Sequence, residues 1–423
     1  MERFDDGISS FWKAMTTTRA EKVSERNRNV VNYKPCYVSS FFESCQNANT
    51  IISGGSSDIR DSAMVAQAMK ASGNGLPVIV LHEGNRHLER LMRDAFLGGG
   101  KYKEISSSSP CFEPFYNLNV IELTNQIVEA APVEYDIKYN ARYYLEGMND
   151  FLRIRGKRLS LDTWAEYPPV TIFNAVDDMQ MQAELDESQA QQIKSKLMAG
   201  QTESYKMDTF LASFKQEMSA IMHVQGSTRE IINIVSAIRD RAVLCFDVGA
   251  VTNRILINIV MYQLRLASMQ GKRYHVIIDS IPMESNKAYA DYIRAMSDNA
   301  SKTIVSDDFY SMTGGNNSLF SSVAGNMSTI IVMRHSSADS ALRWSEVFGQ
   351  YDRYEESYST SRGGMRRNPF SIFAGPSYSK TVNVSRNRDY IVKPEDIVRM
   401  ATGEAYIRTM DNGSVAHVQL MQG

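Results

Sequence analysis

The chain has 423 residues, of which 43% are hydrophobic and 10% aromatic, so it can bury a large core. Its 46 basic and 48 acidic residues nearly cancel, which excludes binding to nucleic acid or anionic membranes through overall charge. The cysteines lack the close spacing of a zinc site and the density of a secreted disulfide scaffold. They are Cys36, Cys45, Cys111 and Cys245. We therefore expect a globular protein of a reducing cytoplasm.

The N-terminal segment from Met1 to Asn29 is charged and amphipathic. It lacks the apolar core of a secretory signal and an apolar run of about 20 residues, so no membrane span is predicted. Its apolar side chains favour a helix that packs on the protein body or on a neighbouring subunit. Attachment to a membrane surface, at the inner face of the membrane, is the alternative.

The first third of the chain alternates strands and helices. Asn49–Ile52 and Leu76–Leu81 are apolar runs typical of buried strands, and Ala63–Ala71 and Asn85–Phe96 have helical periodicity. This alternation predicts a parallel sheet covered by helices.

Helical periodicity then replaces the alternation between Glu134 and Met222. The predicted helices are Tyr139–Arg155, Asp177–Met198 and Tyr205–Met222. We interpret this part as a helical insertion whose polar middle is solvated or binds a partner.

Strands return after the insertion. The predicted strands are Ala242–Phe246, His275–Ile278, Lys302–Val305 and Thr329–Met333, and the helices between them are Arg254–Met269 and Lys287–Asp298. After Arg353 the composition predicts a mobile, loop-rich stretch. Order returns with a helix at Pro394–Met400 and strands at Glu404–Thr409 and Val415–Leu420.

The stretch Thr50–Met64 has the context of a phosphate-binding loop, namely a strand, a glycine turn and a helix. Its candidate nucleotide-binding residues are Gly54, Gly55, Ser56, Ser57, Arg60, Asp61 and Ser62. If Gly54 is the first glycine of the motif, Ile59, Arg60 and Asp61 stand where the motif has its last glycine, its lysine and its Mg²⁺ hydroxyl. A register that begins at Gly55 also lacks the lysine.

These replacements oppose nucleotide binding. Ile59 adds a Cβ where the loop needs a glycine, and Asp61 adds a negative charge beside the polyphosphate. Arg60 keeps a positive charge, so residual binding of ATP and Mg²⁺ stays open. Considered alone, the stretch fits an ordinary serine-rich turn before a helix better than a nucleotide site.

The second element of a nucleotide site is a strand that ends in two acidic residues, one for Mg²⁺ and one for the attacking water. His275–Ser280 supplies only Asp279, which is the candidate Mg²⁺ ligand and, in an active enzyme, a catalytic residue. Ser280 has no carboxylate with which to act as a base.

The order of these elements resembles the conjugative type IV coupling proteins of the TraG/TraD type, in the FtsK/HerA-like P-loop ATPase superfamily. The resemblance rests on Arg241–Leu266, on His275–Ser280, on Ser301–Asp308 and on Thr329–Gly349. It ends with Lys393–Ile407, where a short helix precedes a Gly-Glu-Ala strand.

The resemblance implies a RecA-like, mainly parallel sheet flanked by helices, with an inserted all-α domain. We expect an N-terminal helical segment at 1–30, a first α/β part at 31–133, the all-α domain at 134–225 and a second α/β part at 226–423. It also implies a homo-oligomer, a hexamer in the family, and an all-α domain that faces DNA-processing or secretion partners. The P-loop lysine, the catalytic glutamate, the sensor glutamine and the membrane anchor of typical members are missing.

Two further motifs contain basic or metal-ligating residues. Arg362, Arg366 and Arg367 form the clearest basic concentration and suit contact with a nucleic-acid backbone, although a solvated loop is the commoner outcome. His82–His87 (HEGNRH) does not fit a zinc protease, because its histidines are five residues apart rather than four.

Three functions remain open from the sequence. The leading hypothesis is a coupling-protein-like pseudo-ATPase that recruits partners in a conjugation or type IV secretion-like system. The second is an active DNA-translocating ATPase that uses Arg60, Asp279 and a glutamate such as Glu284. The third is a scaffold that binds neither nucleotide nor DNA.

Overall fold

The computed structural model describes residues 18–44, 48–131, 140–167, 169–223, 230–250, 254–283, 286–295, 299–363, 377–409 and 414–422. The chain divides into two compact units. The smaller comprises Met1–Pro35 and Ile330–Gln419, and the larger comprises Cys36–Thr329 and Leu420–Gly423. Among the described residues, no helix has both the length and the hydropathy needed to cross a lipid bilayer.

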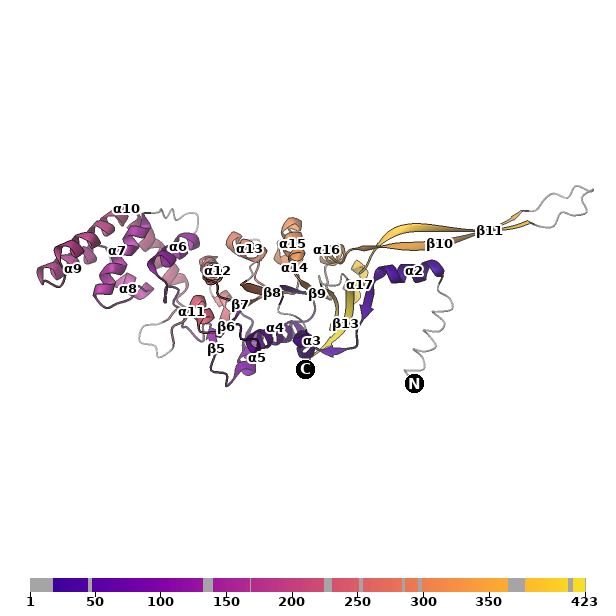
Figure 1. Cartoon of the computed structure of the whole chain (residues 1–423), viewed down its shortest axis with the longest axis horizontal. Coiled ribbons are helices and arrows are strands. Elements are labelled where there is room, and N and C mark those ends of the chain that lie inside the picture. The colour runs from indigo at the N-terminus through magenta and orange to yellow at the C-terminus, as the bar shows by residue number, and fades with distance from the viewer. Residues whose placement is uncertain are drawn as a thin grey trace, which may run out of the picture. The chain divides into compact units, whose positions relative to one another are not determined.

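The larger unit is built on a parallel sheet whose strands lie in the order β3, β8, β7, β4, β6, β5. The bounds are β3 Thr50–Ser53, β4 Val78–His82, β5 Tyr102–Ile105, β6 Val243–Asp247, β7 Tyr274–Asp279 and β8 Ala300–Ser306. The side chains of β3, β4, β6 and β7 are buried throughout, because helices cover both faces of the sheet (Figure 1). The predicted parallel sheet flanked by helices is therefore confirmed.

The helices of this unit follow the strands in the predicted alternation. They are α3 Val38–Ser44, α4 Ser57–Gly73, α5 Arg86–Phe96, α11 Ile234–Arg239, α12 Arg254–Met269, α13 Lys287–Arg294, α14 Phe309–Met312 and α15 Asn317–Gly325, with a 3-10 turn η1 at Val248–Ala250. At one edge of the unit, β2 (Cys36–Tyr37) pairs in parallel with Leu420 and Met421.

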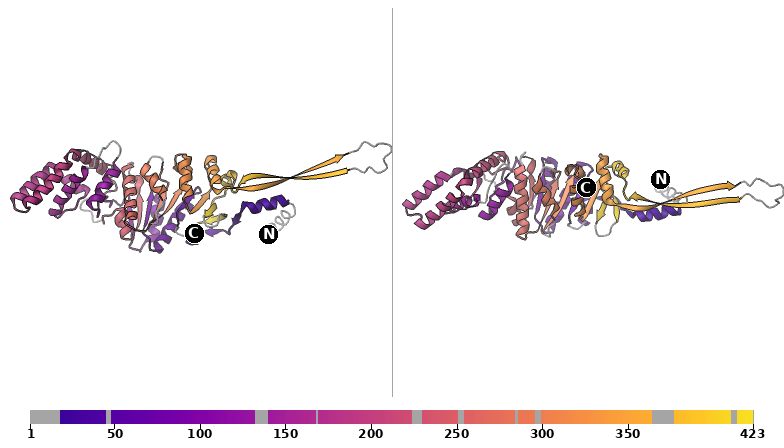
Figure 2. Two further views of the ribbon diagram at one scale, coloured as in Figure 1. Left: turned by 45° about the horizontal axis from the view of Figure 1, so that its top comes forward. Right: turned by 90° about the horizontal axis from the view of Figure 1, so that it is seen from above.

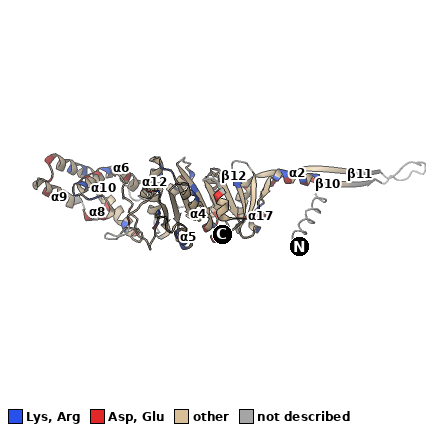
Figure 3. Ribbon diagram, turned by 60° about the horizontal axis from the view of Figure 1, so that its bottom comes forward, with Lys and Arg blue, Asp and Glu red and all other residues tan. Residues whose placement is uncertain are grey.

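Between β5 and α11 the described residues form five helices, where the helical insertion was predicted. They are α6 Val120–Ala130, α7 Ala141–Ile154, α8 Leu161–Glu166, α9 Pro169–Met181 and α10 Glu187–Glu217. Acidic and basic residues alternate along the ribbons of these helices (Figure 3). The structure does not test the boundaries 134–225, which stay a prediction, and α6 begins before them.

Helix α10 runs without a break through Gly200, where the sequence predicted a gap between two helices. Gly200 lies against Tyr144 of α7, so closely that an added Cβ would be 2.3 Å from the Tyr144 Cβ. This glycine therefore lets two helices approach each other and does not end α10.

The polypeptide enters and leaves the helical region through neighbouring segments. The amide of Phe112 donates to the carbonyl of Ile221 (3.1 Å), and the amide of Glu113 donates to the carbonyl of Ile232 (3.0 Å). The Glu113 carboxylate accepts a hydrogen bond from the Phe115 amide at 3.2 Å, and another from the amide of Leu161 at the start of α8. Glu113 is 6% exposed, and burial raises the pKa of its carboxyl to about 7.

In the smaller unit, the described residues form a second group of paired strands and three helices. They are α2 Arg19–Arg28, β1 Val30–Asn32, β9 Thr329–Met333, α16 Ala338–Phe348, α17 Pro394–Arg399, β12 Glu404–Thr409 and β13 Val415–Met421. β13 pairs antiparallel with β12 and parallel with β1. Trp344 and Ile397 are fully buried and anchor α16 and α17 in the core.

The prediction of a loop-rich stretch after Arg353 is wrong. β10 (Gln350–Gly363) and β11 (Ser377–Tyr390) form an antiparallel hairpin of 14 residues per strand, and α2 lies beside its base (Figures 1 and 2). Ion pairs across the strands help to hold the register, for example between Asp352 and Arg386 at 2.6 Å. Such a ribbon needs few apolar side chains, so its sequence lacks the alternation of apolar and polar residues that usually predicts a strand.

Candidate functional site

The carboxyl ends of five parallel strands meet at one edge of the sheet. Ser53 of β3 is in register with Ser306 of β8, and His82 of β4 is in register with Asp247 of β6. β7 lies between β8 and β4 and ends at Asp279. The residues that follow these strands are therefore brought together, at the edge where α/β proteins bind nucleotides.

The turn between β3 and α4 keeps the geometry of a phosphate-binding loop only in its first half. Gly54 and Gly55 have φ angles of 87° and 75°, which favour glycine at both positions. The Gly54 amide is bonded to the Ser306 carbonyl at 3.0 Å. Ser56 is the N-cap of α4, and Ile59, where the motif has its last glycine, is 5% exposed and packs into the core.

The Arg60 guanidinium folds back onto the turn from which it arises. Its Nη1 donates to the carbonyl oxygen of Gly55 at 2.7 Å and to that of Gly54 at 3.3 Å. A P-loop lysine reaches outward to the β- and γ-phosphates. Here the positive charge instead stabilises the turn itself.

Asp61 and Asp279 are joined by one amide. The Asn85 Nδ2 donates to Asp61 Oδ1 at 2.9 Å and to Asp279 Oδ2 at 2.8 Å. The second oxygen of Asp61 lies 2.7 Å from His87 Nδ1, and the second oxygen of Asp279 accepts the Ser280 hydroxyl at 2.9 Å. We call these five residues the carboxylate network.

The two carboxylates of the network are buried and their oxygens are satisfied by neighbouring side chains. Asp61 is 2% exposed and Asp279 is 7% exposed, and each carboxylate oxygen has a protein donor or the His87 ring beside it. Mg²⁺ with a triphosphate would need those oxygens for its own coordination or for waters. The residues present therefore do not fit the metal and nucleotide that the fold implies.

The position of the missing catalytic glutamate is strained. Ser280 has a φ of 55°, a left-handed conformation that costs a non-glycine residue about 1 kcal/mol, and its amide donates to the Val305 carbonyl at 2.8 Å. A described acidic residue that follows the neighbouring strand β4 is Glu83. Partial burial, followed by the charges of Asp247 and Asp279, raises the pKa of the Glu83 carboxyl.

Asp247 joins the loops after β4 and β6. Its Oδ1 accepts the amides of Gly84 at 2.9 Å and Gly249 at 3.1 Å, and Arg86 Nη2 lies 3.7 Å from its Oδ2. Gly249 must be a glycine, because an added Cβ would lie 2.8 Å from the Glu83 Cα. A carboxylate of the protein thus occupies backbone donors of a type that anions use elsewhere.

The structure brings some predicted site residues together and leaves others untested. Arg60, Asp61 and Asp279 meet at the same edge, together with Gly54 and Gly55. Ser57 is exposed and Ser62 is half-buried in α4. The predicted nucleic-acid contacts, the alternative base and one cysteine lie outside the described residues or side chains: Arg362, Arg366, Arg367, Glu284 and Cys45.

Sequence reasoning missed Asn85 and His87. Both belong to the HEGNRH string, whose spacing does not fit a zinc motif. Within the described residues, no three metal-ligating side chains gather closely enough to hold an ion. The signal that could have found them is their place after an apolar strand, because the ends of parallel strands meet.

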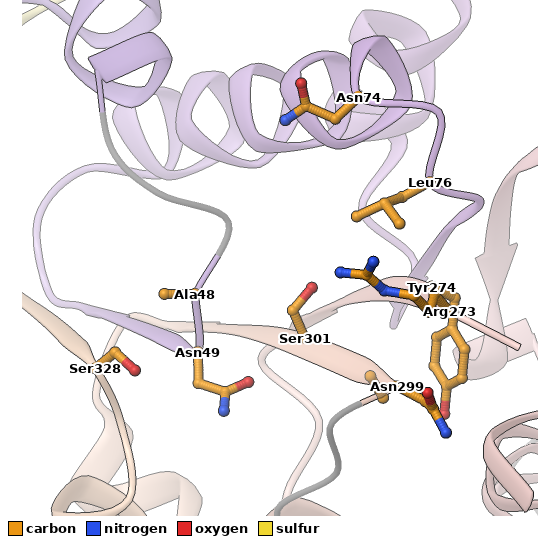
Figure 4. A pocket seen from close by; sticks show the side chains of 10 residues that line it. Ala48, Asn49, Asn74, Leu76, Arg273, Tyr274, Asn299, Ser301 and Ser328 are labelled. Carbon is orange, nitrogen blue, oxygen red and sulfur yellow. The ribbon is translucent and has the colours of Figure 1, made fainter. Parts of the chain in front are cut away.

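A cavity of about 350 Å³ lies at the opposite, amino edge of the sheet (Figure 4). Asn74, the C-cap of α4, lines it, and the Arg273 guanidinium lies between Leu76 and Ser301. The C-terminus of a helix carries partial negative charge and favours a cation such as Arg273. This cavity is therefore a poor place for the phosphates of a nucleotide.

Comparison with known proteins identifies relatives of this fold. Residues 313–421 match the family model of the type IV secretion-system coupling protein DNA-binding domain. The structure is similar to the unbound bacterial conjugative coupling protein TrwBΔN70, with a TM-score of 0.53, 13% identity and coverage of 89% of this chain and 85% of that chain. It is also similar to plasmid coupling protein TrwB in complex with ADP and Mg²⁺, with a TM-score of 0.52, 12% identity and coverage of 97% and 92%.

The chain has the fold of a conjugative coupling protein. The predicted resemblance and the predicted RecA-like α/β fold are both confirmed. No curated protein sequence matches the chain. At 12 to 13% identity to these coupling proteins, the likeness concerns the fold, and the chemistry must be argued from the site.

Proposed function

We propose that this chain is a coupling-protein-like pseudo-ATPase, which recruits DNA-processing or secretion partners in a conjugation or type IV secretion-like system. One observation carries the proposal: Asn85 bridges the buried carboxylates of Asp61 and Asp279, at the place where an ATPase holds Mg²⁺. Arg60, the remaining cation of the turn, bonds to the Gly54 and Gly55 carbonyls.

The energetic argument concerns what nucleotide binding would require. Mg²⁺ and a triphosphate would have to displace Asn85 and His87 from two buried carboxylates, and Arg60 would have to leave two carbonyls. Each charge-assisted hydrogen bond of this kind is worth about 1.5 to 3 kcal/mol, so their loss opposes binding. Asp61 would also repel the polyphosphate.

Titration calorimetry of the full chain with ATP and Mg²⁺, with a phosphate-release assay in the presence and absence of DNA, tests the proposal. We expect neither binding heat nor release above background. Turnover of about 1 per second or more would contradict the proposal. A variant with Ile59→Gly, Arg60→Lys and Asp61→Thr restores the motif, and binding gained only by this variant would support it.

The second candidate is an active DNA-translocating ATPase, and the observation that favours it is Glu83. This acid follows β4, beside the strand that ends in Asp279, and its pKa is raised by desolvation first and then by the charges of Asp247 and Asp279. In such an enzyme Asp279 would hold Mg²⁺ and Glu83 or Glu284 would orient water. DNA-stimulated hydrolysis that Asp279→Asn abolishes would establish this function in place of the first.

A DNA contact of this chain is part of the proposal. The hairpin of β10 and β11 lies within the matched coupling-protein domain, and Arg362, Arg366 and Arg367 stand in or beside the segment that joins its strands. Arginines of this kind bind phosphates without reading sequence, so binding should weaken steeply with salt. Filter binding at two salt concentrations, of the wild type and of a variant with the three arginines changed to glutamine, tests this contact. A scaffold that does not bind DNA would show no difference between the two proteins.

A further inference from the structure

A pocket of about 680 Å³ lies within the larger unit, where the helical region begins. It is bounded by the start of α6, the end of α7, the turn before α8 and the segment that leads into α6. Its volume falls in the range of about 300 to 1,000 Å³ that ligand sites occupy in proteins. None of the residues of the carboxylate network lines it, so this pocket is separate from the candidate nucleotide site.

The walls of the pocket are mainly apolar. Three of the apolar residues that line it are at most 8% exposed, and the other three are half-buried. The buried ones are Phe115, Leu123 and Leu159, and the half-buried ones are Leu118, Val120 and Ile231. The half-buried side chains still expose apolar area to water, and an apolar group of a ligand would remove that area from water.

One polar group of the wall has no partner. His223 lines the pocket, its Nδ1 is shielded from solvent, and within the described residues nothing bonds to that nitrogen. The backbone of His223 is held in place, because its amide donates to the Phe112 carbonyl at 2.9 Å. A buried ring nitrogen without a hydrogen bond is costly. A polypeptide backbone offers a donor and an acceptor at almost every residue, so it could serve either tautomer of this ring.

The mouth of the pocket is basic. Four of the six residues 153–158 are arginine or lysine. Lys157 and Arg158 line the pocket, and Lys157 has an acidic partner, Glu166, at 2.7 Å. Within the described residues, the Arg158 guanidinium bonds only to the neutral amide oxygen of Asn117, at 3.3 Å. The charge of Arg158 can therefore pair with an acidic group of a ligand.

The two acidic residues that line the pocket offer little opposition to such a group. Asp162 pairs with Lys215 at 2.6 Å, and burial raises the pKa of Glu113 to about 7. About half of the Glu113 carboxyls are therefore uncharged at neutral pH. Val120, the first residue of α6, also lines the pocket, and the start of a helix carries partial positive charge.

We propose that this pocket binds a short segment of a partner protein in which an apolar side chain is flanked by acidic residues. The apolar side chain fills the cavity, the backbone of the segment bonds to His223, and an acidic side chain pairs with Arg158. Nucleic acid fits less well, because its phosphates would pair with the cations and leave the apolar walls in water. This binding rests on the recruiting role proposed above, whose partner chemistry it names, and it is independent of the nucleotide site.

Fluorescence polarisation of the full chain with a panel of short fluorescein-labelled peptides tests the proposal. Each peptide carries leucine, phenylalanine or tryptophan between runs of aspartate and glutamate. In one set of control peptides serine replaces the apolar residue, and in another lysine replaces the acidic residues. We expect acidic peptides with an apolar residue to bind, and both kinds of control to bind at least about tenfold more weakly.

Two variants show whether the peptides bind in this pocket. Val120→Trp fills the cavity, and Val128→Trp is its matched control, because Val128 is exposed on the same helix and does not line the pocket. Arg158→Glu reverses the charge at the mouth, and Arg90→Glu does the same at an exposed position of α5. We expect each pocket variant to weaken binding by about tenfold or more, and each control variant to bind as the wild type does.

Circular dichroism and urea unfolding report whether each variant keeps the fold. If Val120→Trp does not fold, Arg158→Glu alone decides. The proposal is overturned if no peptide of the panel binds, or if a folded pocket variant binds as tightly as the wild type. It is also overturned if labelled duplex DNA, and no peptide, is the ligand that the pocket variants lose. Calorimetry with ATP and Mg²⁺ is unaffected by these outcomes, so this binding and the pseudo-ATPase can fail separately.

Discussion

Replacing Glu113 with glutamine should remove a pH dependence of stability that originates beside the helical region. Burial raises the pKa of Glu113 to about 7, against an ordinary value near 4.5. Between these two values the folded state binds more protons than the unfolded state, so stability is highest below this window and falls as pH rises through it. The full loss is about 3 kcal/mol, because each pKa unit corresponds to 1.36 kcal/mol.

The neighbours of Glu113 are held constant in this comparison. Asp162 opposes its ionisation and Lys215 favours it, and these two side chains pair with each other at 2.6 Å. Urea unfolding of the wild type and Glu113→Gln at about pH 5 and about pH 8.5 measures the contribution of Glu113 to stability. The contributions of all other titrating groups cancel in the difference between the two proteins. We expect the variant to be slightly less stable at the lower pH, through loss of an acceptor for the Phe115 or Leu161 amide.

At the higher pH the variant should gain on the wild type, so that the difference between the two proteins shifts by about 2.5 kcal/mol across the range, because pH 5 already lies inside the window. A difference that is the same at both pH values would refute the reasoning. It would mean that the Glu113 carboxyl ionises as it does in the unfolded chain, whatever its burial.

Other changes have expected outcomes that thermal or urea unfolding can check. Gly200→Ala should destabilise by at least about 3 kcal/mol, because the new Cβ meets Tyr144 backbone atoms at 2.4 Å, whereas Gly73→Ala has open space and should be neutral or stabilising. Asn85→Ala should cost about 2 to 4 kcal/mol, since it unpairs two buried carboxylates. Burial lowers the pKa of Lys302 to about 8, so this group should make stability rise between about pH 8 and 10.5, and Lys302→Met should abolish that rise.

The sheet could be predicted because its strands are short apolar runs. Val78–His82 and Tyr274–Asp279 are buried at every position, and a strand buried on both faces has a signal that needs no partner to be recognised. Helices α4 and α5 follow for the same reason, through their apolar positions and the Asn85 cap.

The hairpin could not be predicted in this way. Its strands bury little, so the pattern of Tyr354, Glu356 and Tyr358 has the composition of a loop. What orders these residues is the opposite strand, about 30 positions later, and the α2 side chains some 330 positions earlier. Contacts of that range leave no local signal.

Only part of the candidate site could be predicted from the sequence, for a similar reason. Arg60 and Asp61 follow a glycine turn and could be found by comparison with a motif. Asn85 and His87 belong to the site only because β4 lies beside β7, an order that the chain does not state locally. Motif reasoning finds residues that replace expected ones, and it overlooks residues that have no counterpart in the motif.

The paired segments around Phe112, Ile221 and Ile232 have a consequence for the ancestry and engineering of this chain. A region whose two ends lie side by side can be excised, lengthened or transplanted without rerouting the strands that carry it. The helices from α7 to α10 are thus the part that natural selection or a designer can exchange most freely, whereas α6 is tied to α12 by the buried bond from Gln263 to Gln126. The α/β sheet would keep its strands, while the partners that these helices bind could change.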